Sequence, residues 1–464
     1  MIENARKQIS NEKKLSPEIK ALIDLLIAVI QILAGKRIAK TSRNSNIPPS
    51  MDPNREKKSN AKQERKPGGQ LGHTGYTLQQ ADNPDTIIEI KVNRNNLPVG
   101  HWNHSGYEKR QIFDLKITKQ VTEYRAEIVV NEKGDTMTAE FPEGLVQKAQ
   151  YGNGVKAHSV YMSVQQLIPC ERVSEHFASQ MGLPLSAGTV HNFKEEAYNL
   201  LEPYETWVKE QIGGSKIINC DETGIVVAGN RVWLHVACND RYTLYYPHAK
   251  RGKEAMDAAG VLGGEGGVLI HDHWKPYFTY SDKEHGLCNA HYLRELTAAT
   301  EEGQKWPQRM SELLTEANNQ TIEAGGKLSE EAQHRVRKKY RRILAQAEKE
   351  NPASVQRGEH KRGRIAQGKT RNLVERMVNH EDDILRFMTD TDVPFTNNQA
   401  ERDIRMAKVQ QKISGSFRSW DGAQYFCRIR GYLSTCEKHH ISSADAMKTL
   451  FNGQFPSFMF NMAE

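Results

Sequence analysis

The chain lacks the features that mark secreted and membrane proteins. Its six cysteines are scattered without paired spacing, which argues against a disulfide framework and favours a reducing compartment. The apolar run at 21–33 is too short to cross a bilayer, and Asp24 interrupts it. The first residues are polar and charged, unlike a secretory signal, and no internal repeats are evident. We therefore expect a cytoplasmic protein that does not enter a membrane.

Positive charge is unevenly distributed along the chain. The 464 residues carry a net charge of only +7, and this length predicts two to four domains. Basic residues gather in four runs, at 36–66, 334–342, 360–376 and 402–412. Any one run can be a solvated helix face, but four separated runs favour a nucleic-acid partner.

Three regions of different character precede residue 151. Residues 1–40 are expected to be helical, with Ser16 and Pro17 at a helix start and Gly35 at its end. This helix is apolar nearly all round, so it should pack against a helix of its own chain or of another subunit. Residues 41–85 resemble a flexible basic linker. Residues 86–150 predict a small antiparallel β module, with alternating runs at 87–92, 111–115 and 121–125.

Residues 151–212 are expected to be helical and to contain a helix-turn-helix. One helix ends at Met181, Gly182 begins a turn, and Ser186 precedes a second helix. In DNA-binding proteins of this kind the second helix lies in the major groove, with its first residues towards the bases. The candidate DNA contacts are therefore Ser186, Thr189, His191 and Asn192. An ordinary helical hairpin has the same pattern, so this stretch alone does not decide the matter.

The second half of the chain has the element order of a ribonuclease H-like core. Three successive strands are expected, then a helix, then two further strands, at 216–227, 231–239, 241–246, 253–262, 268–271 and 285–289. The mostly helical residues 291–390 are too long for a connection in such a core and predict an all-helical insertion. Residues 213–290 and 391–464 would then form the two parts of the core. The expected fold class is multidomain α/β.

Three carboxylates fall at informative places in this core. Asp221 lies on the first strand, Asp272 follows a second strand, and Glu401 lies on a late helix. Neighbouring strands can bring the two aspartates close together, where their charges would repel each other unless a cation intervened. Each aspartate alone could be a turn or capping residue. Together the three predict a site for two Mg²⁺ or Mn²⁺ ions and phosphoryl-transfer chemistry.

The helix that carries Glu401 is also basic. Asn397 and Asn398 are expected to cap its start. The candidate DNA contacts on this helix are Asn398, Arg402, Arg405, Lys408 and Lys412. The alternative is a solvated face with a Glu401–Arg405 ion pair, worth only about 0.3–0.5 kcal/mol.

Two short motifs resemble parts of zinc sites. Cys288 and His291 have ligand spacing, but no second ligand pair follows at the spacing that zinc sites use. His101 and His104 form another incomplete pair. We therefore expect no zinc, and we expect His291 and Arg294 to contact phosphate or to support the carboxylate site.

Several of these stretches occur in the same order in one known family. The chain resembles the bacterial transposases of the insertion sequence 66 family through 42–49 (SRNSNIPP), 65–72 (RKPGGQLG), 121–125 (VTEYR), 185–190 (LSAGTV), 221–224 (DETG), 288–291 (CNAH) and 397–402 (NNQAER). The resemblance implies a catalytic Asp-Asp-Glu triad formed by Asp221, Asp272 and Glu401. Many relatives have two Cys-x-x-Cys pairs before the helix-turn-helix. Here the first pair is replaced by histidines and the second is absent, so the zinc is not expected.

These observations predict a DNA transposase. It would bind double-stranded terminal inverted repeats and target DNA, cut the ends of its element and join them to the target. We expect the protein to form a homodimer or a higher oligomer. We also expect helper proteins from the same element as partners and a location at the bacterial nucleoid. The alternatives are a catalytically silent relic that only binds DNA, and a structure-specific nuclease on the same fold.

Overall fold

The computed structural model describes residues 78–264, 266–353 and 367–459. The chain divides into two compact units, whose described parts are residues 78–122 and 123–459. The helix expected at 15–35 and most of the linker expected at 41–85 lie outside the described residues. Among the helices within the described ranges, none has the length and apolarity that crossing a membrane requires.

Residues 78–122 contain one short 3-10 helix, η2 (Arg94–Asn96), and no strand. The Ala81 N–H donates to Oε1 of Gln111 (2.7 Å), and Gln111 Nε2 donates to the Ala81 carbonyl (2.8 Å). The strands expected at 87–92, 111–115 and 121–125 do not form. An alternating run becomes a strand only where another strand pairs with it and a core covers its apolar side. Neither is present here, and Ile90 is 89% exposed.

Pairing begins only after residue 125. Strands β1 (Ile128–Val130) and β2 (Thr136–Thr138) form an antiparallel hairpin. Oδ1 of Asn131 accepts the N–H groups of Lys133 and Asp135, which holds the turn. Within the described residues, the β module expected over 86–150 therefore consists of this hairpin alone.

A group of helices follows, as expected for residues 151–212. Its elements are α3 (Asn153–Val160), the π-helical turn η3 (Tyr161–Gln165), α4 (Cys170–Met181), α5 (Ala187–Leu200) and α6 (Glu202–Gly213). Gly182 ends α4 in the left-handed conformation (φ 57°), which glycine adopts without a steric penalty. Ser186 caps α5 by accepting the Thr189 N–H at 3.0 Å. The predicted helix, turn and helix are thus present.

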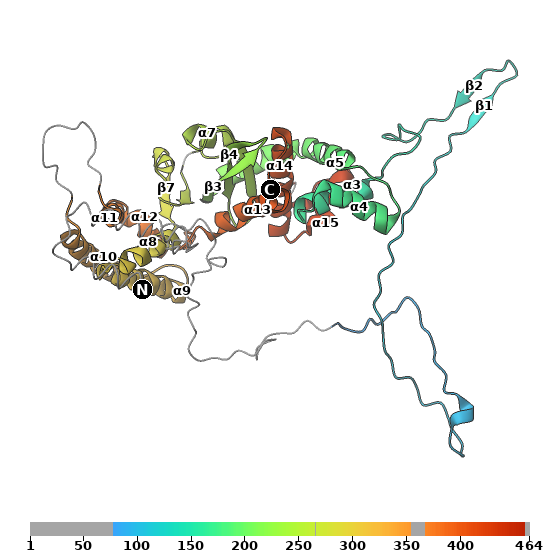
Figure 1. Cartoon of the computed structure of the whole chain (residues 1–464), viewed down its shortest axis with the longest axis horizontal. Coiled ribbons are helices and arrows are strands. Elements are labelled where there is room, and N and C mark those ends of the chain that lie inside the picture. Colours follow the sequence, from blue (N-terminus) through green and yellow to red (C-terminus); the bar gives the residue numbers. More distant parts are fainter. Residues whose placement is uncertain (1–77, 265, 354–366, 460–464) are drawn as a thin grey trace, which may run out of the picture. The chain divides into compact units, whose positions relative to one another are not determined.

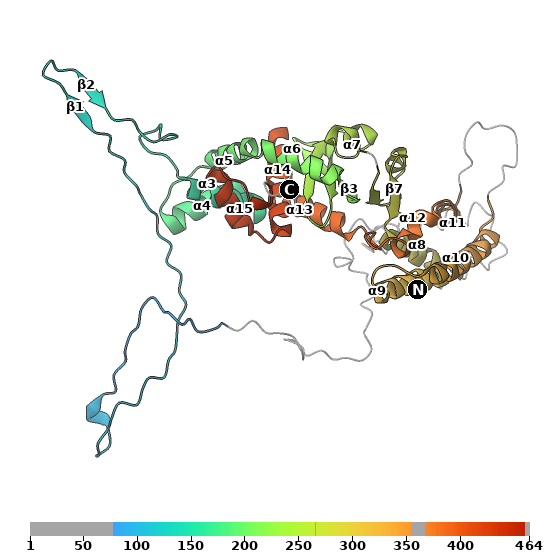
Figure 2. The same ribbon diagram turned by 180° about the vertical axis from the view of Figure 1, so that it is seen from behind.

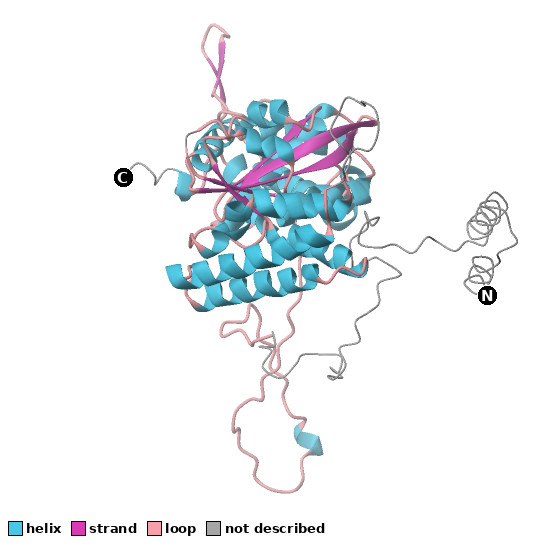
Figure 3. Ribbon diagram, turned by 90° about the vertical axis from the view of Figure 1, so that its left-hand side faces the viewer, coloured by secondary structure: helices cyan, strands magenta, loops and turns pink. Residues whose placement is uncertain are grey.

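A mixed five-stranded sheet lies at the centre of this unit, with helices on both sides (Figure 3). Its strands are β3 (Ile217–Val227), β4 (Asn230–Cys238), β5 (Thr243–His248), β6 (Val268–His271) and β7 (Glu284–Leu287). The order is β5-β4-β3-β6-β7. Strands β3, β4 and β5 are antiparallel neighbours, whereas β6 and β7 run parallel to β3. The β3–β4 turn is formed by Ala228 and Gly229, both at positive φ.

Different helices cover the two faces of the sheet. Helix α7 (Lys253–Ala259) and the 3-10 turn η4 (Lys275–Thr279) lie on the face that carries Cys220 and Glu222. Helices α13 (Asn398–Ser414) and α14 (Trp420–Lys438) pack on the opposite face, together with α6. The C-terminal elements α15 (Ser443–Phe451) and η6 (Ser457–Met459) follow, and α15 packs against α3.

A second hydrophobic core lies beyond β6 and β7. It is built by α8 (Asn289–Glu301), α9 (Trp306–Glu323), α10 (Glu330–Glu350), α11 (Lys369–Asn379), α12 (Glu381–Leu385) and η5 (Arg386–Met388). Trp306 and Tyr340 are fully buried in it beside Ile270 from β6. Figures 1 and 2 show α9 and α10 side by side, away from α3 to α5. All these helices lie between β7 and α13 in the sequence.

Candidate active site

One predicted site residue, Asp221, lies on β3, and another, Asp272, directly follows the neighbouring parallel strand β6. Pairing of β3 with β6 runs from Ile217 opposite Val268 to Asn219 opposite Ile270. Asp221 and Asp272 each lie two residues beyond that last pair. Their carboxylates are held by backbone N–H groups: Oδ1 of Asp221 accepts from Glu222, and Oδ1 of Asp272 accepts from Trp274, both at 2.8 Å. The strand register therefore brings together two acidic residues that are far apart in the sequence.

The electrostatics of Asp221 show that negative charge is concentrated here. Burial raises the pKa of Asp221 to about 8, and the nearby charges of Glu222, Asp272 and Glu401 raise it as well. The hydrogen bond from the Glu222 backbone acts in the opposite direction. The charges of Asp272 and Glu401 thus reach Asp221, and a cation beside Asp221 would relieve this repulsion.

Asn397 ties the start of α13 to the strand that carries Asp221. Its Nδ2 donates to the Cys220 carbonyl (2.7 Å), and its Oδ1 accepts from Nδ2 of Asn219 (3.0 Å). The expectation that the Asn397 side chain caps α13 is wrong, because that side chain makes no capping hydrogen bond. A buried strand carbonyl needs a partner, and Asn397 supplies it. This pairing places Glu401, one helical turn later, beside the sheet.

Glu401 has only long polar contacts among the described residues. Its Oε1 lies 3.8 Å from Cys288 Sγ, 3.7 Å from His291 Nδ1 and 3.6 Å from a guanidinium nitrogen of Arg294. The Glu401 side chain is 24% exposed. His291 and Arg294 are thus brought to the carboxylate site, as expected. No short ion pair neutralises the glutamate.

On the other face of β3, Glu222 belongs to an arrangement that sequence reasoning missed. Its side chain is 2% exposed, pairs with Arg251 (2.6 Å) and accepts a hydrogen bond from the Tyr277 hydroxyl (2.7 Å). The Arg251 guanidinium also lies 4.7 Å from the Trp233 ring centre and 4.2 Å from that of Trp274. Strand alternation places the neighbour of Asp221 on the opposite face, which was the available signal. The arrangement holds the loop after Asp272.

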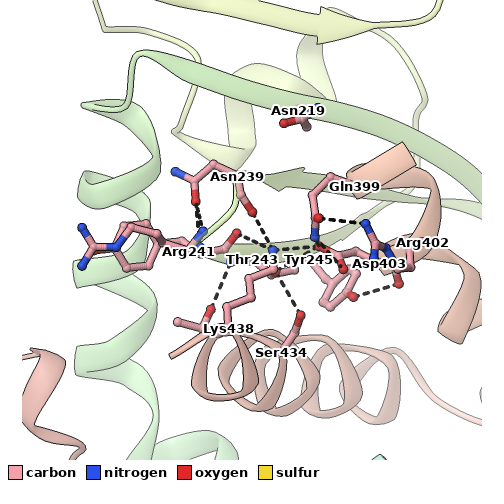
Figure 4. A network of polar contacts seen from close by, with 12 residues as sticks. Asn219, Asn239, Arg241, Thr243, Tyr245, Gln399, Arg402, Asp403, Ser434 and Lys438 are labelled. Carbon is pink, nitrogen blue, oxygen red and sulfur yellow. Dashed lines mark hydrogen bonds and ion pairs between the residues drawn. The ribbon is translucent and has the colours of Figure 1, made fainter. Parts of the chain in front are cut away.

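A buried polar network on α13 was also missed (Figure 4). Asp403, two residues after Glu401, pairs with Lys438 of α14 at 3.0 Å, and both side chains are nearly buried. Asp403 also accepts hydrogen bonds from Thr243 (3.1 Å) and Gln399 (3.2 Å). Lys438 donates further bonds to the carbonyls of Asn239 and Tyr242 and to the Thr243 hydroxyl. No local spacing links residues 243, 403 and 438.

A comparison with known protein families gives the site its context. The model of the Transposase IS66 family matches residues 148–425, a range that includes Asp221, Asp272 and Glu401. The chain belongs to this family. It is also 31% identical over 70 residues to the uncharacterized protein y4jO of Sinorhizobium fredii. That match covers 15% of this chain and 22% of the relative, so the chain spans about a fifth of that relative's length. The resemblance inferred from the sequence is confirmed at the level of the family.

In this IS66 family member, the candidate DNA contacts on α13 differ in their exposure to solvent. Four of the five candidates are exposed, namely Asn398, Arg402, Arg405 and Lys412. At 100° per residue they share one stripe of the helix. Lys408 lies off this stripe, seven residues from Glu401, and donates to the Gly224 carbonyl. Burial lowers the pKa of Lys408, and Arg231 contributes to the same effect. Lys408 thus contacts the sheet, and the exposed stripe is the part of α13 available to a phosphate backbone.

The candidate contacts on α5 have several partners within the protein. The Ser186 hydroxyl caps the helix and lies 2.8 Å from that of Thr189. The His191 ring packs against Tyr425 of α14, with ring centres 5.5 Å apart. Asn192 is exposed. The structure therefore gives local roles to three of the four residues and leaves Asn192 on the surface.

The basic run at 334–342 is partly neutralised within the protein. Arg337 pairs with Glu381 (3.1 Å) and Asp382 (2.6 Å), and Arg341 pairs with Glu381 (2.8 Å). In the described part of the 360–376 run, Arg371 and Arg376 pair with Glu375 and Glu295. Arg337 and Arg341 thus join α10 to α12, and Arg376 joins α11 to α8, whereas the Arg371–Glu375 pair lies within α11.

Proposed function

We propose that the chain is an Asp-Asp-Glu transposase that cuts the ends of an insertion sequence and joins them to target DNA. The observation that carries the proposal is that Asp272 and Glu401 lie close enough to Asp221, on the central strand β3, for their charges to act on it. The strand order β5-β4-β3-β6-β7, with three antiparallel strands followed by two parallel ones, supports a ribonuclease H-like core. Helices α8 to α12 would then be the insertion at 291–390, between the two parts of the core at 213–290 and 391–464.

The residues present suit hard divalent cations. Carboxylate oxygens are the ligands that Mg²⁺ and Mn²⁺ prefer. The raised pKa of Asp221 reflects burial first and neighbouring negative charge second, and a cation would offset both. Asp221, Asp272 and Glu401 would hold two such ions. When bound, the ions supply a clamp on the attacking and leaving oxygens of the phosphoryl transfer.

The protein's own groups would orient the DNA strand. Hydrolytic cleavage breaks the P–O3′ bond as a water oxygen attacks phosphorus, and it leaves a 3′-hydroxyl at the element's end. In strand transfer that hydroxyl attacks a phosphodiester of the target, and the target's own 3′-oxygen leaves. The exposed stripe Asn398, Arg402, Arg405 and Lys412 would hold phosphates close to Glu401. Nearly all the rate enhancement would come from positioning and charge neutralisation.

The other regions would bind and pair the ends. The helix-turn-helix at 151–212 would bind the inverted repeats, with residues 41–85 as a basic linker and 1–40 in subunit pairing. The protein would act as a homodimer or larger assembly at the nucleoid, together with helper proteins. A helix cap can still contact DNA, so Ser186, Thr189, His191 and Asn192 remain candidates.

Strand cleavage of a labelled duplex that carries the element's end tests the proposal. Wild type should nick the end in Mg²⁺ and not in EDTA. Glu401→Gln should lose roughly 10²–10³-fold in rate, because it removes a ligand charge while retaining shape. Glu323→Gln, an exposed change of the same kind on α9, serves as the control and should cut normally.

Other outcomes separate the alternatives. Sequence-specific binding without cleavage, even with the element's helper proteins added, would contradict the enzyme and favour a DNA-binding relic. Cleavage of branched DNA regardless of sequence, without end joining, would favour a nuclease.

A further inference from the structure

Three potential metal ligands converge where α8 meets α13. Cys288 Sγ, His291 Nδ1 and a carboxylate oxygen of Glu401 all lie within 4.8 Å of one another. The two separations from Glu401 Oε1 are 3.8 Å to the sulfur and 3.7 Å to the imidazole nitrogen. Tetrahedral zinc with bond lengths of about 2.0–2.3 Å requires ligand atoms roughly 3.3–3.8 Å apart. These side chains could therefore surround one such ion with small adjustments.

The sulfur of Cys288 is surrounded by backbone N–H groups. The residue is buried, and the N–H of Asn397 donates to Sγ at 3.1 Å. The backbone N–H groups of Ala290 and His291 also lie close to the sulfur. A donor directed at a sulfur can stabilise the thiolate, which is the form that binds metals. The turn between Cys288 and His291 thus has two features of a metal-binding turn: ligand spacing and donors to the sulfur.

His291 adds an independent observation. Its Nδ1 is buried from solvent and has no hydrogen-bond partner among the described residues. A buried polar atom without a partner is costly, and a bound ion is one explanation for it. The imidazole nitrogen of a neutral histidine is a common metal ligand.

One neighbouring group opposes a cation. Arg294 lies 3.6 Å from the same Glu401 oxygen, although its side chain is 58% exposed and can turn into solvent. Its positive charge would compete with an ion for the carboxylate.

We propose that Cys288, His291 and Glu401 form a binding site for a softer divalent ion of the Zn²⁺ type. Thiolate and imidazole select such an ion over Mg²⁺, which prefers oxygen ligands. The thiol proton is released when the Cys288 sulfur binds. Three protein ligands leave one position open, as in catalytic rather than structural zinc sites. The sequence predicts no zinc because no second ligand pair follows Cys288 and His291, whereas the fold supplies Glu401 from 110 residues further on.

This inference deepens the proposed function, because it rests on Glu401 taking part in cation binding at the same site. It implies that one cation position beside the aspartates would differ in selectivity from an all-carboxylate site. The transposase would then respond differently to Mg²⁺ alone and to Mg²⁺ with a trace of Zn²⁺.

Cobalt(II) titration of the full-length protein, followed by absorption, tests the site without a DNA substrate. Wild type should bind one Co²⁺ with a sulfur-to-cobalt charge-transfer band. Cys288→Ser should lose the band, and His291→Gln should raise the Kd for Co²⁺ by on the order of tenfold or more. Cys170→Ser changes a partly exposed cysteine elsewhere and should keep the band. Arg294→Ala should lower the Kd several-fold by removing the competing charge.

The possible results separate this site from the proposed function. Absence of the charge-transfer band in wild type, or its persistence in Cys288→Ser, would overturn the zinc-type site. Because His291 is partly exposed, His291→Gln keeps the test valid if Cys288→Ser fails to fold. A wild type with the band but without strand cleavage would retain the site and count against the transposase. Mg²⁺-dependent cleavage without the band would support the transposase and overturn the zinc-type site.

Discussion

Helix α13 carries two acidic residues, two positions apart, whose surroundings differ sharply. Asp403 faces α14 and β5, from which Lys438 and Thr243 donate to its carboxylate, and Gln399 of α13 donates to it as well. Glu401 lies near Asp221, and its polar contacts within the described part of the chain are all 3.6 Å or longer. The first carboxylate is fully satisfied by the protein, and the second is not.

The two surroundings indicate two different roles, with Asp403 supporting the fold and Glu401 serving the candidate site. A buried charge that is paired and fully hydrogen-bonded orients the elements that it joins, and breaking it is costly. A group of carboxylates without cationic partners destabilises the fold, so its presence calls for another explanation, such as a bound cation. The network around Asp403 fixes the rotation of α13, and that rotation directs Glu401 towards Asp221 and Asp272.

The largest expected effect is a dependence of stability on pH that originates at Asp221. Its folded pKa of about 8 lies above the unfolded value of about 3.9, so the folded protein binds more protons between these two pH values. Asp221 alone should therefore contribute a loss of stability as pH rises from 4 to 8, by on the order of 5 kcal/mol. The lowered pKa values of the buried His235, His271 and His273 act in the opposite direction, so the contribution of Asp221 is measured by urea unfolding as a difference between wild type and a variant, without divalent cations.

Asp221→Asn isolates this contribution. The histidines titrate in both proteins and cancel in the difference between them. The variant should gain stability over wild type as pH rises, and saturating Mg²⁺ should reduce that gain. Parallel stability curves for the two proteins would mean that Asp221 is not in a repulsive cluster. The contrast between the unsatisfied carboxylates and the satisfied Asp403 would then no longer hold.

The next-largest expected effect is a loss of stability at Asp403, the carboxylate that the protein satisfies. Lys438→Met should leave Asp403 buried without its cation and lower the free energy of unfolding by about 3–5 kcal/mol. Adding Asp403→Asn to this variant should restore part of the loss, because the uncompensated charge is removed. Thermal or urea unfolding measures both.

An exposed ion pair provides the matched control. Lys448 and Asp445 are both about two-thirds exposed, so Lys448→Met should cost no more than about 1 kcal/mol. Equal losses in Lys438→Met and Lys448→Met would contradict the supporting role of the network.

The smallest effect is expected at Asn397, which connects the start of α13 to strand β3. Asn397→Ala should cost about 1–3 kcal/mol, because Asn219 and the Cys220 carbonyl lose their partner. It should also lower the cleavage rate, since α13 is no longer held against β3. Asn398→Ala, at the exposed neighbouring position, should leave stability unchanged. A normal cleavage rate in a destabilised Asn397→Ala would show that Asn397 does not position Glu401.

Local patterns were informative where a segment's structure depended on its own residues. The end of α4 at Gly182, the cap at Ser186 and β6 at 268–271 appear as predicted, because turn glycines, caps and short buried runs are local signals. The expected strands at 87–92 and 111–115 failed because a strand needs a partner that their own residues cannot supply. Asn397 failed as a cap because a buried strand carbonyl took its side chain.

The sequence by itself determined the family and the order of most strands and helices in the second half of the chain, and it singled out Asp221, Asp272 and Glu401 as candidates. These follow from residue order and periodicity, which need no knowledge of distant contacts. Only the tertiary structure decided which charges would be satisfied: Lys438 reaches Asp403, and Cys288 and His291 meet Glu401. The physical reason is that hydrogen bonds and ion pairs act over a few ångströms, whereas these partners are separated by 35 to 113 residues of chain.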